Sequence, residues 1–178
     1  MDDIISRTEL IGIPVIEIQK GKKIGEIGDI LFDNHNGIIK GVMVFLKHWI
    51  KKRSILTNER IVTTSRYSLL AYDSIDTTNL GDKIIQGRDL IGVKLIREDG
   101  YEVGKVSDIF INRKNWAIVG YELSIGVIDD FVHGRSLLPY TIPYGSDNNA
   151  LVVTNYQYEN IRYYADAGIK NIFFNTIK

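Results

Sequence analysis

A basic segment with one tryptophan is the first candidate for chemistry in this sequence. Lys47, Trp49, Lys51, Lys52 and Arg53 lie within seven residues and combine four full positive charges with an indole ring. Lysine and arginine bind phosphate oxygens, and an indole stacks on a nucleic-acid base or lies at a membrane interface. The simpler alternative is a solvated loop whose tryptophan packs against the end of a domain.

An acidic pair, Asp129 and Asp130, follows much later in the chain. The opposed charges predict that the basic segment of one domain or subunit meets this pair on another. Such charge pairing raises the rate of association more than it raises the affinity. These seven residues are our candidates for partner binding, and a homo-oligomer is one arrangement that they allow.

Sequence patterns typical of enzymes and metal sites are missing. The glycine-rich stretch Gly21–Gly25 lacks the spacing of a phosphate-binding loop, and no Gly-x-Ser-x-Gly motif is present. His35, His48 and His133 are isolated, there is no cysteine, and Asp33–Gly37 lacks the later glutamate of a calcium loop. We therefore expect no catalytic residue, cofactor or metal, and tight turns at both loops.

Two aspartates, Asp29 and Asp33, lie four residues apart on a predicted strand and so would share one face. They would be about 13 Å apart, too far to share a proton. Asp29 recurs as Asp108 in a later part of the chain. We expect both to face solvent or to accept a turn amide, with a ligand or proton-handling role as the alternative.

An internal repeat organises these residues. Leu10-Ile11-Gly12-Ile13 recurs eighty positions later as Leu90-Ile91-Gly92-Val93, and the stretch 21–33 then recurs at 100–112 with a spacing of seventy-nine. The repeat predicts two domains, residues 8–78 and 88–155, followed by a tail, residues 156–178.

Each repeat has the pattern of short strands joined by tight turns. Apolar segments at 13–18, 24–32 and 38–46 are separated by turn signals such as Lys20-Gly21-Lys22. We therefore expect an all-β fold of two small antiparallel barrels. Glycines that recur within strands, Gly25/Gly104 and Gly41/Gly120, are expected at bends or bulges of the coiled sheets.

Together, the motif Leu-Ile-Gly-Ile-Pro-Val, the spacing Gly-x-x-x-Gly-x-x-x-Asp-Ile and a strand entered through Ile-x-Gly-Val resemble the PRC-barrel family. The resemblance covers about 140 residues in two copies. That family includes the cytoplasmic domain of the photosynthetic reaction centre H subunit and the C-terminal domain of a ribosome maturation factor. It implies a protein- or RNA-associated assembly module without shared catalytic machinery. Thr57 and Lys94 depart from the family pattern, where prolines are expected.

The composition and the two ends of the chain bear on the kind of partner and on the expected location of the protein. The 22 basic and 22 acidic residues balance, so the net charge does not argue for nucleic acid or anionic membrane. We see no secretory signal and no apolar run near the 20 or so residues of a membrane span, and we expect a cytoplasmic protein. The tail is rich in aromatics, and we expect a short helix over 158–167 that ends at Gly168. Its aromatics would pack back on the barrels or form a partner site.

The sequence thus predicts a non-enzymatic protein-interaction or assembly module. The alternative is an RNA- or ribosome-associated factor that uses residues 47–53. A peripheral membrane contact is compatible with the same segment.

Overall fold

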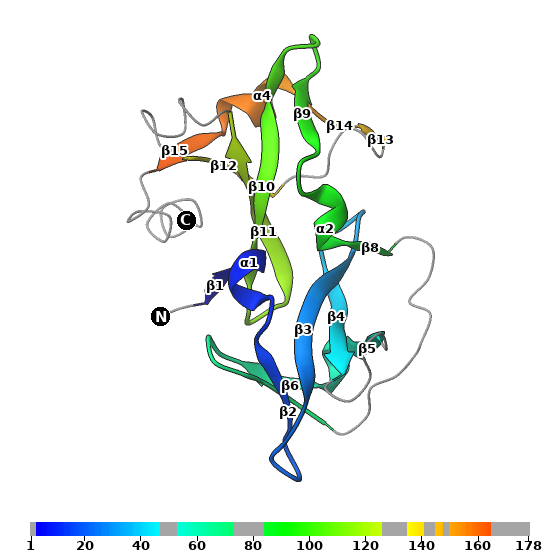
Figure 1. The fold of residues 1–178 in the computed structure, drawn as a ribbon. Coiled ribbons are helices and arrows are strands. Elements are labelled where there is room, and N and C mark those ends of the chain that lie inside the picture. The colour runs from blue at the N-terminus through cyan, green and yellow to red at the C-terminus, as the bar shows by residue number, and fades with distance from the viewer. Residues whose placement is uncertain are drawn as a thin grey trace. The chain divides into compact units, whose positions relative to one another are not determined.

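The computed structural model describes residues 3–46, 53–72, 84–125, 135–140, 145–147 and 150–164 (Figure 1). The chain divides into two compact units, and each is described by itself. Unit 1 comprises Met1–Arg88 and Ile111–Ile118, and unit 2 comprises Asp89–Phe110 and Val119–Lys178. The domain limits expected from the repeat remain a prediction.

Unit 1 is a strand-rich unit with two short helical turns. Its elements are β1 (Ile4–Ser6), α1 (Arg7–Leu10), β2 (Pro14–Glu17), β3 (Lys22–Asp33), β4 (Ile39–Leu46), β5 (Arg53–Thr57), η1 (Asn58–Arg60), β6 (Ile61–Thr64), β7 (Leu69–Ala71) and β8 (Ile84–Gln86). The sheet has the order β5-β4-β3-β2-β7-β6, and β8 also pairs with β3. Figure 1 shows β3 and β4 as the two long neighbouring strands.

Unit 2 repeats this plan. The helix α2 (Gly87–Leu90) leads into β9 (Lys94–Arg97), β10 (Glu102–Asn112), β11 (Ala117–Ser124), β12 (Arg135–Pro139), β13 (Gly145–Asp147), β14 (Ala150–Val153), α4 (Asn155–Glu159) and β15 (Arg162–Tyr164). The order is β13-β14-β9-β10-β11-β12-β15, and β1 pairs with β10. The end of β10, the turn and the start of β11 belong to unit 1.

The predicted all-β fold is confirmed, with one correction to the antiparallel pairing expected throughout. One pair in each sheet runs parallel, β2 with β7 and β9 with β14. These partners are far apart in sequence, and only such a long connection lets a strand return in the same direction. Equivalent backbone bonds also confirm the repeat: Gly12 N donates to Ile27 O at 2.7 Å, and Gly92 N donates to Val106 O at 2.8 Å.

Burial of aliphatic side chains stabilises the two sheets. In unit 1 the side chains of Val15, Ile30, Phe32, Val44 and Leu56 are fully buried. Each such side chain contributes about 1.5–3 kcal/mol. In unit 2, Leu95, Ile109 and Leu123 are buried in the same way.

The glycines within strands lie where backbones approach closely. A Cβ on Gly25 would lie 2.2 Å from the carbonyl oxygen of Phe45, and one on Gly41 would lie 2.4 Å from that of Leu56. The strand register shifts beside both positions, as expected for bulges. A Cβ on Gly104 or Gly120 would lie 2.7 Å from the carbonyl oxygen of Ser124 or Leu138, respectively, so all four positions exclude larger side chains.

Of the two arrangements expected for Asp29 and Asp108, exposure to solvent is not found, and acceptance of a backbone amide is. Their residues are only 1% and 7% exposed, and each carboxylate accepts the following amide, from Ile30 and Ile109 respectively, at 2.8 Å. Asp29 also accepts Arg7 Nε at 2.8 Å and the amide of Arg88, in the first turn of α2, at 3.1 Å. The expected turn amide is thus present, but it belongs to a helix that begins the second repeat.

The residues around Asp29 leave little room at this junction. A Cβ on Gly87 would lie 2.7 Å from Ile30 Cγ1 and 2.8 Å from Arg7 Cδ. Immediately before it, β8 pairs with β3, with Gln86 opposite Leu31. Asp29 therefore fixes both α1 and the segment between the repeats to β3.

Asp33, the last residue of β3, is half-buried, whereas Asp29 is fully buried. The carboxylate of Asp33 closes the predicted turn by accepting the amide of His35 at 2.8 Å. The side chain of Asn36 donates to the same carboxylate at 3.3 Å. This arrangement is an Asx turn, which is the role that the sequence predicts for residues 33–37.

The expected tail helix at 158–167 is misplaced. The helix α4 begins earlier because Thr154 caps it: Thr154 Oγ1 accepts the amide of Gln157, and Gln157 Oε1 accepts the amide of Thr154. It ends at Glu159, and Arg162–Tyr164 then pairs as β15 with β12. Gly168 lies outside the described residues.

Two equivalent turns close the long hairpins with different residues. Gly37, between β3 and β4, has φ +67°, and Trp116, seventy-nine positions later, has φ +50°. The left-handed region favours glycine and costs another residue about 1 kcal/mol. The two turns are joined, since Ile39 N donates to Trp116 O and Ile118 N donates to Gly37 O.

We predict that Asp29→Ala lowers the free energy of unfolding by about 3 kcal/mol, because the Arg7 guanidinium and two backbone amides lose a buried charged acceptor. Urea denaturation followed by circular dichroism measures the change. Glu26→Gln on the same strand is the control: it removes an exposed pair with Lys23, worth at most about 1 kcal/mol. Equal effects of the two substitutions would contradict the role of Asp29.

Candidate functional site

Most of the predicted site residues lie outside the described residues. These are Lys47, Trp49, Lys51, Lys52, Asp129 and Asp130. Only the backbone of Arg53 is described, as the first residue of β5 opposite Phe45. The pairing of the basic and acidic segments therefore stays a prediction.

Unit 2 has a groove, the tyrosine groove, with a volume of about 240 Å³. It is lined by Tyr101, Val103, Ile125, Ser136, Tyr158, Glu159, Ile161 and Tyr163. Tyr101 and Tyr163 are 57% and 59% exposed, and Ile125 is 43% exposed. Large aromatic and aliphatic surfaces therefore face solvent together on this unit.

Arg97, at the end of β9, orders the aromatic wall of the tyrosine groove. Its guanidinium carbon lies 5.3 Å from the ring centre of Tyr101 and 4.9 Å from that of Tyr158. Both distances are within the range of cation–π attraction. Asp99 holds the same guanidinium through Arg97 Nε at 2.8 Å and through a second, shorter contact to Nη2.

This ion pair changes the acidity of the Asp99 carboxyl. The hydrogen bond from Arg97, followed by the backbone amide of Tyr101, lowers the pKa of Asp99 to about 2. The carboxylate is therefore charged at all physiological pH values. The arginine is thus held by Asp99 and lies over two tyrosine rings.

The elements around the groove are tied together by their own hydrogen bonds. Glu98 Oε1 accepts the amide of Asn155 at 3.1 Å, which attaches α4 to the β9–β10 turn. On the other wall, β15 pairs with β12, with Tyr163 opposite Ser136. The buried Glu122 accepts Arg135 Nη1 at 2.6 Å and Ser107 Oγ at 2.9 Å, which fixes β12 to the neighbouring strands. These hydrogen bonds fix the elements that line the groove to one another.

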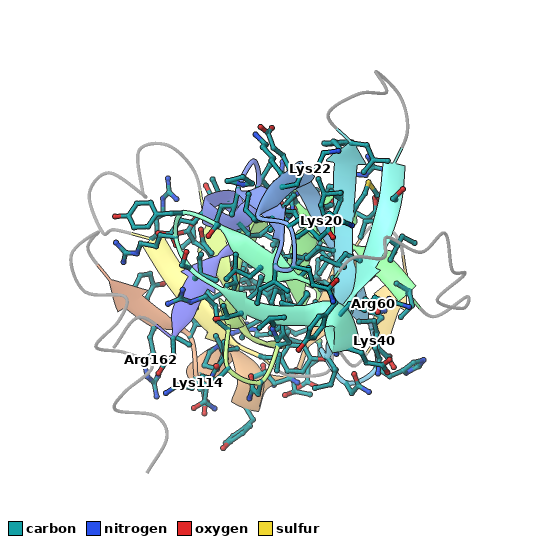
Figure 2. All side chains as sticks on the ribbon, turned by 90° about the horizontal axis from the view of Figure 1, so that it is seen from below. Lys20, Lys22, Lys40, Arg60, Lys114 and Arg162 are labelled. Carbon is teal, nitrogen blue, oxygen red and sulfur yellow. The ribbon has the colours of Figure 1, made fainter. Side chains whose placement is uncertain are left out.

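The same positions in the first repeat have different chemistry. Tyr101 corresponds to Lys22, and Arg97 corresponds to Glu17, whose carboxylate accepts Lys20 Nζ at 2.8 Å. Lys20 and Lys22 lie on the exposed β2–β3 turn of unit 1 (Figure 2). The ring-stacking arginine is therefore a property of the second repeat.

Sequence reasoning found part of this groove. It singled out Tyr158 and Tyr163 as tail residues that either pack back or form a partner site. Arg97 and Tyr101 were missed, although the aligned repeats show lysine and glutamate at the equivalent positions. A comparison of the two repeats at their turns is the sequence signal that could have identified Arg97 and Tyr101.

The groups in the groove suit binding. Tyrosine, which combines a large apolar ring with a hydrogen-bonding hydroxyl, supplies three of the groove's lining residues and is enriched at protein interfaces. Across the part of the chain that the structure describes, no group of three His, Cys, Asp or Glu residues could hold a metal ion.

Comparison with known families agrees with this strand plan. The model of the PRC-barrel domain matches the chain twice, at residues 2–86 and 82–171. The chain belongs to the PRC-barrel domain family. The resemblance drawn from the glycine and aspartate spacing is thereby confirmed, with its two tandem copies. No curated protein sequence matches this PRC-barrel chain. None of the helices described in it has the length and apolar character needed to cross a bilayer.

We predict that the Asp99 carboxyl titrates with a midpoint at about pH 2 in the folded protein. Because its pKa is lowered on folding, the Arg97–Asp99 pair is fully formed above the ordinary aspartate value, about 3.9, and is lost as the pH falls through the folded value. Carbon-detected NMR of the side-chain carboxyl measures the midpoint. Arg97→Gln should raise it towards the ordinary value, and an ordinary midpoint in the unmodified protein would contradict the pair.

Proposed function

We propose that this PRC-barrel protein is a non-catalytic protein-interaction module that helps to hold a larger assembly together, and that it binds a protein partner through the tyrosine groove. The single observation behind this proposal is the group of exposed tyrosines, Tyr101 and Tyr163, beside the arginine-stacked Tyr158. Tyrosine and arginine are the residue types that most often dominate binding energy at protein interfaces.

The size of the groove favours a protein partner over a small molecule. Its volume of about 240 Å³ is below the range of about 300–1,000 Å³ typical of small-molecule sites. A groove of this size accepts one or two side chains from a partner. The polar ends that surround it, the tyrosine hydroxyls and Glu159, suit the rim of such a contact.

The rigidity of the groove lowers the cost of binding. Each tyrosine has only two side-chain torsions. The Arg97 guanidinium contacts the rings of both Tyr101 and Tyr158 and so restrains their orientation. Less side-chain entropy is therefore lost when a partner covers these rings. The alternative of RNA binding through residues 47–53 rests on the sequence alone and stays a prediction.

Site-specific photo-crosslinking tests the proposal. We would replace Tyr163, and in a second variant Tyr101, by benzoylphenylalanine in the full chain and irradiate the cells that contain it. We predict a discrete protein adduct from both positions, because a partner seated in the groove lies within reach of the photoreactive ketone.

Tyr67 is the matched control, since it is an 83% exposed tyrosine in unit 1 and takes no part in the groove. Adducts of equal yield from Tyr67 would indicate random collisions and contradict a groove-specific partner. Adducts that nuclease removes would show that the partner is RNA, which would also contradict the proposal.

A further inference from the structure

A second groove lies in unit 1 beside the strand β6. Its volume is about 400 Å³, and its walls come from β6, from Asp3 and from the turn that holds Arg113, Lys114 and Trp116. The strand β6 is at the end of the sheet order, so its outer edge pairs with no strand that the structure describes. We call this site the β6 groove.

Cations outnumber carboxylates in the β6 groove. Lys114 Nζ pairs with Asp3 Oδ2 at 2.8 Å, and the lysine side chain is 74% exposed (Figure 2). Arg113 donates through Nη1 to the carbonyl oxygen of Thr64 at 3.2 Å, and its charge has no carboxylate partner among the described residues. The groove therefore has a net charge of about +1, counted from these three side chains.

The hydrogen-bonding capacity of Arg113 is also incompletely used. Its Nε is buried and has no partner among the described residues. A buried donor without an acceptor costs free energy, which a negatively charged oxygen recovers when it binds the guanidinium. Arg113 is itself fixed, because its backbone amide donates to the carbonyl oxygen of Asp3 at 2.7 Å.

Trp116 has a left-handed backbone conformation that residues other than glycine rarely adopt. It is the only residue other than glycine with a positive φ in the described part of the chain, and the first repeat has Gly37 there. Unfavourable backbone conformations of this kind persist chiefly where a site uses the side chain. Here Trp116 lines the β6 groove together with the 41% exposed Val62.

We propose that the β6 groove binds an extended acidic segment of a partner protein. A glutamate or aspartate side chain of that segment lies between Arg113 and Lys114, and an adjacent apolar side chain packs on Trp116 and Val62. The outer edge of β6 offers backbone donors and acceptors to the peptide groups of the same segment.

The carboxylate within the groove favours an acidic peptide over a phosphate-bearing ligand. Asp3 already neutralises one of the two cations, and the pKa of its carboxyl is lowered chiefly by the hydrogen bond from Lys114. A single carboxylate matches the remaining charge, whereas a nucleic-acid backbone brings repeated phosphates close to Asp3. The apolar pair of Trp116 and Val62 suits the aliphatic side chains that flank an acidic residue in an extended segment.

This inference rests on the proposed protein-binding function but uses a different surface. The tyrosine groove belongs to unit 2, and the β6 groove belongs to unit 1. Failure at one surface is therefore distinguishable from failure at the other, because each has its own variants.

An NMR titration tests the proposal with the full chain and a synthetic probe. The probe is a blocked peptide with the sequence Gly-Val-Glu-Val-Glu-Val-Gly, compared with the same peptide carrying glutamine for glutamate. We expect the acidic peptide to shift the amide signals of Val62, Thr63 and Lys114 and the indole signal of Trp116. Binding of the glutamine peptide should be weaker by about tenfold, because the contact with the cations is lost.

Variants of the protein locate the site. We expect Lys114→Gln and Trp116→Gly each to weaken the acidic peptide several-fold, while Trp116→Gly keeps the protein folded because glycine suits the left-handed turn. Lys22→Gln removes an exposed lysine elsewhere in unit 1 (Figure 2), and Tyr163→Ala alters the tyrosine groove. Neither control should change peptide binding.

Four results would overturn the inference. The first is no shift of these signals by the acidic peptide at several millimolar. The second is equal binding of the glutamine peptide. The third is an unchanged affinity in both Lys114→Gln and Trp116→Gly. The fourth is displacement of the peptide by a ten-nucleotide uridine RNA that itself shifts the Trp116 indole signal, which would assign the groove to nucleic acid.

Discussion

A carboxylate removed from water needs hydrogen-bond donors at both oxygens, and at Asp29 they come from three separate segments. Arg7 approaches from α1, Ile30 from β3 itself and Arg88 from the first turn of α2. Together these donors satisfy both oxygens of the carboxylate. Within unit 1, the first turn of α2 and the strand β8 that precedes it are both held against β3.

The two repeats keep this frame and differ at their turns. Glu17 is replaced by Arg97, Lys22 by Tyr101 and Gly37 by Trp116. The strand pairing that the repeats share is formed by backbone hydrogen bonds and does not depend on these side chains. Turns on a rigid frame are where binding residues most often lie. The tyrosine groove and the β6 groove are both built from them.

Spacing alone predicted the parts of the fold that depend on local sequence. The hairpin turns at Gly21 and Gly100, where φ is positive, follow from glycine patterns. The close approaches at Gly25 and Gly41 do so as well, because a Cβ there would collide with a backbone carbonyl. The burial of Asp29 could not be predicted from local sequence, since its partner Arg88 lies fifty-nine positions away. The tail helix was misplaced because its cap, Thr154, precedes the segment that the aromatics had marked. The tyrosine groove was half predicted, since Arg97 joins it only through tertiary contact.

The hydrogen-exchange rate of the Arg88 amide is the most direct test of its hydrogen bond to Asp29. This N–H is in the first turn of a short helix, where no intrahelical acceptor is available to it. If Asp29 accepts it as the structure shows, it exchanges as slowly as the amides of β8 that pair with β3, and Asp29→Asn makes both faster. Exchange of the Arg88 amide at the rate of an unstructured peptide in the unmodified protein would contradict the account.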